Sequence, residues 1–364
     1  MKRIIHVVHR LDIGGLERVL LNCVNTMPAD EFEHRIITLA GYSSEFAALL
    51  EHNIQVISLH KRDGNDLRIF KRFYDEINRF KPDCVHSYNL ATFELQLVAW
   101  FARVKLRVHA EHGRDIIDPE GVNPKYRLMR KVLAMFTHRI VPVSRDLYSW
   151  LRDDVGVDEA KLRLIVNGID TEYFSPTHSP TDNKKFVFGH VGRLAKIKNQ
   201  ALLINAFYAA TQQSKAFANN CALRIVGGGE CMAPLAQLID SYQLTEKVEL
   251  VGPTLNVKAE YDDMDVFVMS SLAEGIPMTL LESMSCGVPP VVTRVGGMPE
   301  VVNALCGKLY DSGNEQRLAD IMLSLFFDPT QVSALGSKAR DIIVGQYSET
   351  SMVDAYIRLY RGEW

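Results

Sequence analysis

Short runs of apolar, often β-branched residues alternate with longer amphipathic segments along the whole chain, and this alternation constrains the fold more than any other feature. In residues 17–24, for example, apolar side chains recur at helical spacing. Strand–helix–strand repetition predicts an α/β fold, in which helices cover both faces of a parallel sheet. The runs expected to form strands are residues 3–8, 35–39, 55–58, 84–86, 107–110, 140–143 and 164–166 in the first half, and 186–191, 222–226, 247–250, 266–269 and 290–293 in the second.

The rhythm restarts after a stretch whose composition suits a linker. Residues 171–185 include Pro176, Pro180 and several small polar residues. A chain of 364 residues is long enough for roughly two domains. We therefore expect two doubly wound parallel-sheet domains, residues 1–170 and 186–348, facing a cleft at the carboxyl ends of their strands, where such sheets bind ligands. A helical segment at 351–360 follows, and periodicity alone does not place it.

Composition and charge exclude several classes of protein. A net charge of −3 argues against a polycation that binds nucleic acid. The six cysteines are scattered without metal-ligand spacing, which favours a reducing compartment over a disulfide framework. No apolar stretch approaches the ~20 residues of a membrane-spanning helix, and the first residues do not resemble a signal peptide. We expect a cytoplasmic protein that either stays in solution or binds the inner face of the cell membrane peripherally.

The segment 270–287 carries the richest set of functional candidates. It follows the apolar run 266–269, and it places Gly275 in a turn and Pro277 at the start of a helix. The free amides of Met278, Thr279 and Leu280 are then expected to form an anion site. Glu274 precedes this helix and Glu282 lies within it among apolar residues, where a carboxylate needs hydrogen-bond donors such as sugar hydroxyls. The alternative is an ordinary helix with two solvated glutamates.

A second candidate, residues 189–199, leaves the predicted strand 186–191. Gly192 lets a ligand approach the backbone, and Arg193 and Lys198 add two positive charges. A guanidinium fork and a lysine ammonium together suit a diphosphate. A basic loop on the solvated surface is the alternative, and the segment becomes informative only beside the 270–287 candidate.

Two weaker candidates lie in the first half. Gly14 and Gly15 precede a predicted helix and could border a phosphate or an acceptor, although they do not form a dinucleotide-binding fingerprint and a simple tight turn is the alternative. His112 follows the strand 107–110 and is expected near the mouth of the cleft; a structural histidine bonded to a loop carbonyl is the alternative. His86 and His190 are weaker candidates still.

The acidic run 262–265, Asp-Asp-Met-Asp, invites interpretation as a metal site. Its position immediately before a predicted strand favours the end of a helix instead. We therefore predict no metal ligands in this segment.

Taken together, these residues resemble the retaining glycosyltransferases of family 4, which have the two-domain GT-B fold. The resemblance rests on the Gly-Gly-x-Glu turn at 14–17, on Gly192-Arg193-Leu194 with Lys198-Asn199, on the Glu-x7-Glu spacing from Glu274 to Glu282, and on residues 166–170 before the linker. The first 25 residues and residues 111–130 look most like sugar transferases of bacterial exopolysaccharide gene clusters.

The resemblance implies a role for each candidate. Arg193 and Lys198 would hold the nucleotide diphosphate, Glu282 the ribose hydroxyls and Glu274 the donor sugar. His112 would touch the sugar near its reacting face, and the final helix, 349–364, would pack back onto the first domain. The nucleotide-sugar-binding set implied in this way is Gly14, Gly15, Gly192, Arg193, Lys198, Gly228, Pro253, Gly275, Ile276, Pro277, Met278, Thr279 and Glu282, with the base near 226–229 and 251–254.

The implied activity is transfer of a hexose, with retained configuration, from a nucleotide sugar to a glycan or lipid-linked acceptor in exopolysaccharide or capsule synthesis. A UDP-sugar is favoured over a GDP-sugar, and neither a cofactor nor a metal is expected. The alternatives are a GT-B relative with another chemistry, such as a nucleotide-sugar epimerase, and a catalytically silent sugar-nucleotide-binding subunit.

Residues 125–136 combine basic and apolar side chains on a short helical segment. Residues 101–150 hold ten Lys and Arg against five Asp and Glu. This local excess suits the surface of an anionic membrane, which would give access to a lipid-linked acceptor. A helix with an apolar core stripe and a solvated basic face is the alternative.

Overall fold

The computed structural model describes residues 1–12, 14–62, 64, 66–114, 118–177 and 185–363. The chain forms two compact units: unit 1 consists of residues 1–167 and 349–364, and unit 2 of residues 168–348. Of the linker predicted at 171–185, residues 178–184 lie outside the described part. The C-terminal helix α16 (Glu349–Arg361) belongs to unit 1.

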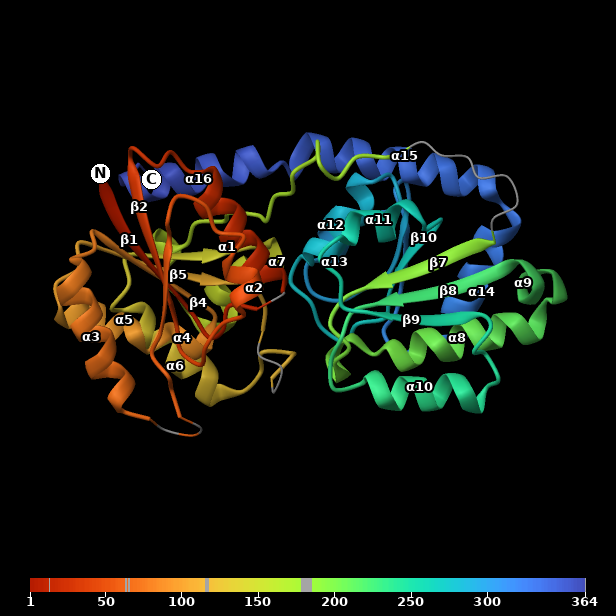
Figure 1. Cartoon of the computed structure of the whole chain (residues 1–364), viewed down its shortest axis with the longest axis horizontal. Helices are drawn as coiled ribbons and strands as arrows, with labels where there is room; N and C mark the ends of the chain where they lie inside the picture. The colour runs from red at the N-terminus through yellow and green to blue at the C-terminus, as the bar shows by residue number, and fades with distance from the viewer. Residues whose placement is uncertain (13, 63, 65, 115–117, 178–184, 364) are drawn as a thin grey trace. The chain divides into compact units, whose positions relative to one another are not determined.

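Unit 1 is built on a six-stranded parallel sheet with the order β3-β2-β1-β4-β5-β6; Figure 1 labels four of these strands, β1, β2, β4 and β5. This is a doubly wound order, in which the direction of winding reverses between β1 and β4. The strands are β1 (Lys2–Val8), β2 (Phe32–Thr38), β3 (Gln55–Ser58), β4 (Cys84–Tyr88), β5 (Leu106–Glu111) and β6 (Arg139–Pro142), and the helices are α1 (Gly15–Thr26), α2 (Ser44–Ala47), α3 (Arg68–Phe80), α4 (Leu90–Phe93), α5 (Leu95–Phe101), α6 (Pro124–Ala134), α7 (Arg145–Ser149) and α16, with a π-helical turn at Trp150–Val155 and a 3-10 turn at Glu159–Lys161.

Both ends of the helix α16 form hydrogen bonds with the rest of unit 1. At its start, Asn22 and Thr26 of α1 donate to the carboxylate of Glu349 at 2.6 and 3.1 Å. At its end, Arg361 forms two hydrogen bonds with the carboxylate of Glu31, at 2.6 and 2.8 Å. The last helix of the chain therefore completes the unit that the first residues begin.

A buried chain of histidines and tyrosines lies between α16 and the sheet. The hydroxyl of Tyr360 lies 2.7 Å from Nδ1 of His86, and the hydroxyl of Tyr88 lies 3.0 Å from the same nitrogen and 2.9 Å from Nδ1 of His6. Nε2 of His6 in turn lies 3.0 Å from Nδ1 of His34. Burial lowers the pKa of His6 and His86 well below its usual value and lowers that of His34 to about 4. All three imidazoles are therefore neutral at pH 7.

Unit 2 repeats the same architecture. Its six parallel strands have the order β12-β11-β10-β7-β8-β9, again doubly wound, with the reversal between β7 and β10. The strands are β7 (Phe186–Val191), β8 (Cys221–Val226), β9 (Val248–Gly252), β10 (Val266–Met269), β11 (Pro290–Thr293) and β12 (Lys308–Tyr310), and the helices are α8 (Gln200–Gln213), α9 (Lys215–Asn220), α10 (Met232–Ser241), α11 (Val257–Asp262), α12 (Met278–Ser285), α13 (Met298–Val301), α14 (Glu315–Phe327) and α15 (Pro329–Gln346), with a 3-10 turn at Lys196–Lys198.

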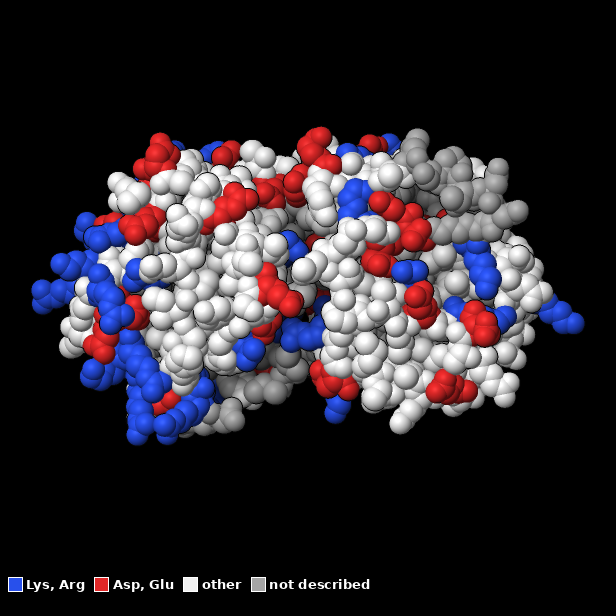
Figure 2. Space-filling model, viewed as in Figure 1, with Lys and Arg blue, Asp and Glu red and all other residues white. Residues whose placement is uncertain are grey.

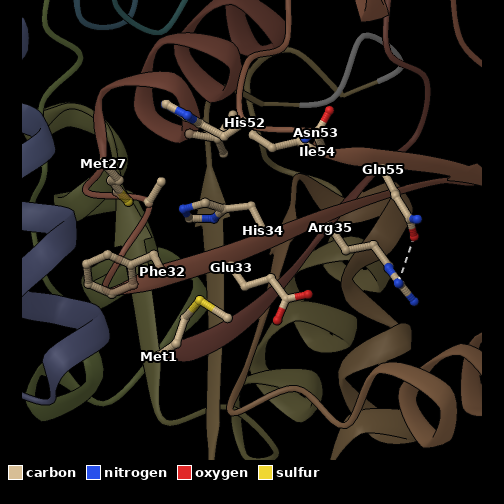
Figure 3. Close-up of a pocket in the computed structure, with 12 residues that line it drawn as sticks. Met1, Met27, Phe32, Glu33, His34, Arg35, His52, Asn53, Ile54 and Gln55 are labelled. Carbon is tan, nitrogen blue, oxygen red and sulfur yellow. Dashed lines mark hydrogen bonds between the residues drawn. The ribbon is translucent and has the colours of Figure 1, made fainter.

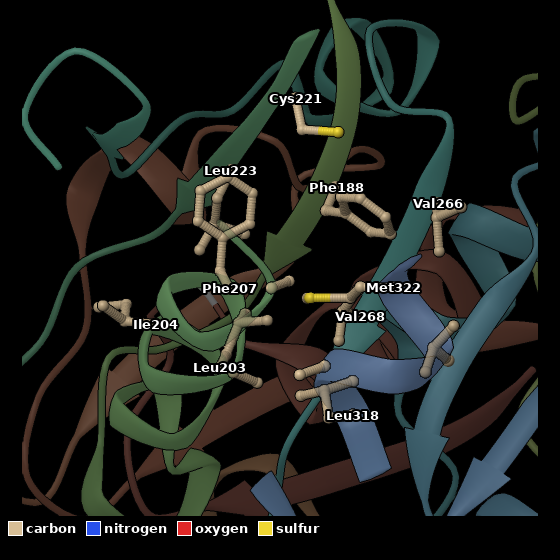
Figure 4. Close-up of a cluster of buried hydrophobic side chains, with 14 of the residues drawn as sticks. Phe188, Leu203, Ile204, Phe207, Cys221, Leu223, Val266, Val268, Leu318 and Met322 are labelled. Carbon is tan, nitrogen blue, oxygen red and sulfur yellow. The ribbon is translucent and has the colours of Figure 1, made fainter. Parts of the chain in front are cut away.

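The core of unit 2 lies between this sheet and the helices α8 and α14. Phe188 of β7, Leu203 and Phe207 of α8, and Met322 of α14 pack there, each fully buried (Figure 4). This apolar layer holds the central strands in place, and the loops that leave their carboxyl ends start from a rigid base.

The predicted strands agree with the structure in most cases, and the α/β class and the doubly wound parallel sheets are confirmed. The strand predicted at 164–166 is wrong, however. This segment runs beside β6 for only two backbone hydrogen bonds, from Arg163 N to Ile140 O at 2.9 Å and from Ile165 N to Pro142 O at 3.2 Å, and then leaves the sheet. The short strand β12 was not expected. Among the described residues, no helix combines the length and the apolar character needed to cross a bilayer.

Candidate functional site

The loops after β7, β8 and β10 meet at the carboxyl edge of the unit 2 sheet. The amide of Leu194, after β7, donates to the carbonyl of Gly228, after β8, at 2.9 Å. The amide of Leu272, after β10, donates to the carbonyl of Ile197 at 2.8 Å. Because the strand order reverses between β7 and β10, this edge is where a doubly wound sheet binds its ligand.

Lys198 and Glu274, predicted on separate loops, form an ion pair at this edge. The ammonium Nζ of Lys198 lies 2.5 Å from Oε1 of Glu274, and both side chains are largely buried. The hydroxyl of Ser271 donates to the same oxygen at 2.6 Å. Two charge-assisted hydrogen bonds therefore converge on one carboxylate oxygen.

Arg193 is exposed at the same edge, and its backbone is held by buried groups. Nδ1 of His190 donates to the carbonyl of Val268 at 2.9 Å, so its Nε2 is left as an acceptor for the Gln200 amide at 3.2 Å. That amide also donates to the carbonyl of Arg193 at 2.9 Å. Burial lowers the pKa of His190 to about 4, so the ring stays neutral. His190 thus supports the loop that carries Gly192 and Arg193.

The helix α12 starts one residue later than expected and uses one of the predicted amides. Pro277 is its N-cap and Met278 its first helical residue. The amide of Leu280 donates to the carbonyl of Pro277 at 3.1 Å and is not available to an anion. Among the described residues, the amides of Met278 and Thr279 have no such partner. The predicted anion site therefore keeps two of its three amides.

Glu282 is buried within α12 and is bonded to a protein group. The hydroxyl of Tyr261, on α11, donates to Oε2 of Glu282 at 2.7 Å. Burial, and then the neighbouring carboxylate, raise the pKa of Tyr261 well above its usual value, so the phenol keeps its proton. The Tyr261 hydroxyl is therefore a protein donor to this carboxylate, whereas the sequence led us to expect donors from a ligand.

The loops predicted near the nucleotide base lie together as well. The amide of Gly227 donates to the carbonyl of Gly252 at 2.8 Å. A Cβ added at Gly228 would lie 3.5 Å from Cδ of Pro253, and one added at Gly229 would collide with the carbonyl of Leu194. Gly227 and Gly229 have positive φ values, and a Cβ at either position would collide with a backbone carbonyl, which explains why glycines occupy these two positions.

The remaining candidates lie in unit 1. Gly14 is the N-cap of α1, and Gly15 is its first residue. The carboxylate of Glu17 folds back over Gly14 so closely that a Cβ there would collide with it. Because the first turn of α1 already carries this negative charge, an anion bound at Gly14 would compete with Glu17.

His112 follows β5 in a strongly polar setting. Its amide donates to Oδ1 of Asn89 at 2.8 Å, and its Nε2 is a buried atom without a partner among the described residues. Burial lowers its pKa to about 3. The preceding residue, Glu111, is fully buried, and it accepts from Nε of Arg130 at 2.7 Å. A neutral imidazole with an open nitrogen therefore stands beside a rigid ion pair.

The acidic run at 262–265 ends a helix, as predicted. Helix α11 ends at Asp262, whose carboxylate accepts from Nζ of Lys258 at 2.9 Å, and Asp265 accepts from the amide of Val187 at 2.7 Å. The described residues contain no cluster of three His, Cys, Asp or Glu side chains suited to a metal ion.

An open cavity of about 360 Å³ lies in unit 1, away from all of these candidates (Figure 3). It is found beside the amino ends of β1, β2 and β3, opposite the carboxyl edge of the unit 1 sheet, and Figure 3 shows the His34 side chain among the others that line it. None of the predicted site residues lines it. Its walls are formed by Met1, Val24, Met27, Ala29, Phe32, Glu33, His34, Arg35, His52, Asn53, Ile54 and Gln55.

Several supporting residues escaped the sequence analysis. Ser270 and Ser271 look like ordinary loop residues, yet both are fully buried and hydrogen-bonded. Gly296 has a positive φ of 51°, and a Cβ there would collide with the carbonyl of Glu274. The Gly296-Gly297 pair was the one readable signal, because paired glycines after a strand often mark a close backbone approach.

Two family models match the chain and together span residues 13–342. The model described as Glycosyltransferase Family 4 matches residues 13–173, and the one described as Glycosyl transferases group 1 matches residues 174–342. With its two doubly wound parallel sheets, the chain belongs to glycosyltransferase family 4 and has the GT-B fold. It is accordingly an enzyme of the hexosyltransferase class.

Individual relatives agree with this membership. The UDP-Gal:alpha-D-GlcNAc-diphosphoundecaprenol alpha-1,3-galactosyltransferase of Escherichia coli is 26% identical over 98% of this chain and 96% of its own length. The putative colanic acid biosynthesis glycosyltransferase WcaL of Escherichia coli K12 is 31% identical over 65% of this chain and 60% of its own. The crystal structure of Anabaena HepE with UDP and glucose superposes with a TM-score of 0.86 at 20% identity, covering 99% of this chain and all of that one. The predicted resemblance and fold are confirmed.

Proposed function

We propose that this chain transfers a hexose, with retention of configuration, from a nucleotide sugar to a glycan or lipid-linked saccharide in bacterial exopolysaccharide or capsule synthesis. The observation that carries the proposal is the pairing of Lys198 with Glu274 at the carboxyl edge of β7 and β10, beside Arg193. A UDP-sugar is the favoured donor and a GDP-sugar the alternative. HepE was crystallised with UDP and glucose, and the name of the galactosyltransferase relative specifies a UDP-sugar and a diphosphoundecaprenol-linked acceptor; both support this choice.

In this mechanism, unit 2 binds the donor. Arg193 and Lys198 stabilise the negative charge that develops on the departing nucleoside diphosphate, together with the amides of Met278 and Thr279. Glu274 accepts a hydrogen bond from the hexose ring, and Glu282 accepts one from the ribose. These carboxylates orient the donor and take no part in bond making.

The transfer itself requires no protein nucleophile. The bond from the anomeric carbon to the diphosphate oxygen breaks, and its electron pair leaves with the nucleoside diphosphate. The acceptor hydroxyl attacks the same face of the sugar, and its proton passes to the departing phosphate oxygen, so the configuration is retained. Gly14, Gly15 and His112 of unit 1 are assigned to the acceptor and to the reacting face of the sugar. Neither a cofactor nor a metal ion takes part.

The test uses the purified full chain. UDP-, GDP- and ADP-sugars are screened by thermal shift, because a ligand that binds the native state raises the melting temperature. The donor that binds is then incubated with a polyprenyl-diphosphate-linked saccharide. Release of free nucleoside diphosphate together with an extended acceptor supports transfer. An isomerised nucleotide sugar would instead indicate an epimerase, and binding without turnover would indicate a silent subunit.

Variants test the assignment of residues. Glu274→Gln and Lys198→Ala should each reduce transfer by roughly 100-fold or more, since each removes an interaction with a charged group in a largely buried site. Lys338→Ala is the matched control, because Lys338 on α15 pairs with Asp341 at 3.0 Å and has no assigned role. Normal rates in both site variants would contradict the assignment. The anomeric proton coupling of the product, measured by NMR, tests retention.

We also propose that unit 1 binds an anionic membrane surface through α5 and α6. Two arginines of the predicted basic segment turn inward: Arg127 bonds to the carbonyl of Gly121, and Arg130 bonds to Glu111. The solvent-facing side of α6 is therefore less basic and more apolar than the sequence suggested. Its exposed apolar side chains, with those at the end of α5, are 44–71% exposed; this apolar patch consists of Trp100, Phe101, Leu128, Val132 and Met135.

Positive charge surrounds the apolar patch. Lys125 and Lys131 are exposed on α6, and Lys105 follows α5 with 84% of its side chain exposed. On the face shown in Figure 2, further Lys and Arg side chains gather over α3, and Tyr74 of α3 contacts Phe101 of the patch, with ring centroids 5.9 Å apart. An apolar patch bordered by cations suits insertion between anionic headgroups.

Binding to vesicles tests this second proposal. The chain should co-sediment with phosphatidylglycerol vesicles in a salt-sensitive way, and Phe101→Ser with Met135→Ser should reduce binding at least tenfold, because each exposed apolar side chain adds insertion energy. Leu305→Ser is the matched control, since Leu305 is as exposed as Phe101 but belongs to unit 2. Equal binding by the double variant and the control would exclude the patch.

A further inference from the structure

Two adjacent serines directly after β10, Ser270 and Ser271, are fully buried although serine is usually a surface residue. A buried hydroxyl needs a hydrogen-bond partner, and each of these serines has a different one. The hydroxyl of Ser270 donates to the backbone carbonyls of Asn199 at 2.8 Å and Lys198 at 3.2 Å. The hydroxyl of Ser271 donates to the side chain of Glu274 at 2.6 Å. One serine therefore fixes a loop, and the other fixes a carboxylate.

The carboxylate of Glu274 is held through one oxygen only. Oε1 receives both the Ser271 hydroxyl and the Lys198 ammonium, the latter at 2.5 Å. Among the described residues, none donates to Oε2. The terminal torsion of a glutamate is broad and weakly restricted, so these two bonds decide which way the second oxygen faces. Oε2 is therefore the oxygen that remains to accept a ligand hydroxyl.

The surroundings of the carboxylate keep this arrangement rigid. The carbonyl of Ser271 accepts from the hydroxyl of Thr293 on β11 at 2.8 Å, so the serine is anchored from behind. The backbone of Glu274 lies directly against Gly296, and the amide of Gly297 donates to the carbonyl of Gly275 at 3.1 Å. The main chain at Glu274 is thus clamped by the loop after β11, and only the side-chain torsions remain to be fixed.

We propose that Ser271 is a positioning residue that aims Oε2 of Glu274 at a hydroxyl of the donor hexose, and that it does so alone once the diphosphate has drawn Lys198 away. This inference rests on the proposed function, in which Lys198 binds the diphosphate. In the structure, Lys198 and Ser271 share the carboxylate. A bound diphosphate offers Lys198 a second negative partner, whereas the hydroxyl of Ser271 carries no net charge and keeps its hydrogen bond to Oε1.

The proposal predicts separate effects on the binding of the nucleotide and on the transfer of the sugar. Ser271→Ala removes the bond that orients Glu274 and leaves the diphosphate contacts in place. UDP should then bind as in the unaltered enzyme, while kcat/KM for transfer falls roughly tenfold or more, the usual effect of losing a hydrogen bond to a charged group. Ser271→Thr keeps a hydroxyl at the same position and should recover much of the loss.

Ser270→Ala is the matched control, because it removes an equally buried hydroxyl from the neighbouring residue. That hydroxyl holds the backbone of Lys198, so its loss should weaken the binding of UDP itself. Transfer is measured with the donor that the unaltered enzyme uses, chosen from UDP-glucose, UDP-galactose and GDP-mannose. The affinity of both variants for UDP is measured by calorimetry. If the donor is GDP-mannose, GDP replaces UDP in the calorimetry. The melting temperature is recorded in parallel.

The outcomes are distinct. Unchanged nucleoside diphosphate affinity with reduced transfer in Ser271→Ala, and recovery in Ser271→Thr, support the proposal. Parallel losses of affinity and transfer in Ser271→Ala, or transfer at the normal rate, overturn it, because a merely structural serine would affect both quantities or neither. Failure of the unaltered enzyme to release nucleoside diphosphate from any donor would refute the proposed function instead.

Discussion

Replacing Arg130 by methionine should destabilise unit 1 by about 3–5 kcal/mol, because it leaves the charge of Glu111 buried without compensation. Both side chains are almost completely inaccessible, and Nε of Arg130 lies 2.7 Å from Oε1 of Glu111. Burial by itself would raise the pKa of Glu111, but the Arg130 charge and a contact with His109 outweigh it and lower that pKa to about 2. Without Arg130, the cost of burying the charged carboxylate is no longer offset, and this is the physical basis of the figure.

The assay can follow unit 1 alone. The two tryptophans among the described residues, Trp100 and Trp150, belong to unit 1, and the third tryptophan of the sequence stands at position 364. Trp150 is buried, and the Arg130 guanidinium lies 5.0 Å from its ring centroid. Tryptophan fluorescence during urea unfolding therefore reports this unit, and with a typical slope of about 2 kcal/mol/M the midpoint should fall by about 2 M.

A double-mutant cycle separates the ion pair from general packing. Glu111→Gln removes the carboxylate charge, so Glu111→Gln combined with Arg130→Met should be far more stable than the sum of the single losses predicts. A single Arg130→Met variant within 1 kcal/mol of the unaltered chain, or a double variant as unstable as that sum, would refute the reasoning.

Three further outcomes are expected. Tyr360→Phe, which removes the hydroxyl bonded to His86, should lower the stability of unit 1 by about 1–2 kcal/mol in the same fluorescence assay; an unchanged midpoint would show that the bond contributes nothing. Acid should destabilise unit 1 because burial lowers the pKa values of His34 and of the neighbouring His6 and His86. Below about pH 6.5 the unfolded chain binds protons that the folded chain does not, so the free energy of unfolding falls towards pH 4 by up to about 1.4 kcal/mol per pH unit for each histidine. A flat profile over this range would contradict the assignment of neutral rings. Gly296→Ala should reduce transfer at least tenfold, because the new Cβ collides with the carbonyl of Glu274 at a backbone φ that also disfavours alanine; transfer at the normal rate would show that this close approach does not position the glutamate.

The sequence predicted those parts of the fold whose signal is local. The strands β7, β10 and β11 were predicted with their observed ends, because each is a run of buried residues between clear breaks. The segment 164–166 has the same composition but too few partners to join a ladder, and β12, at only three residues, is too short to show a pattern. Pairing with a neighbouring strand, which composition does not encode, decided both cases.

The same distinction applies to the candidate site. Arg193, Lys198 and Glu274 could be recognised as candidates, and the start of α12 could be predicted to within one residue, because charged residues and helix breakers stand out in a sequence. The Lys198–Glu274 pair joins residues 76 positions apart, and the contact of Ser270 with the Lys198 loop spans 72. Ser271 could not be recognised, since its importance comes from complete burial beside a carboxylate and not from its type.

The course of the chain through its two units has a consequence for biosynthesis. Residues 168–348 leave the ribosome as one continuous block, so unit 2 can fold as soon as they emerge. Unit 1 must wait for α16, because Tyr356 and Tyr360 of that helix cover the imidazole of His86. The nascent protein therefore passes through a stage in which its later-made half is finished and its first-made half is not. A premature stop codon shortly before position 349 would make that stage permanent.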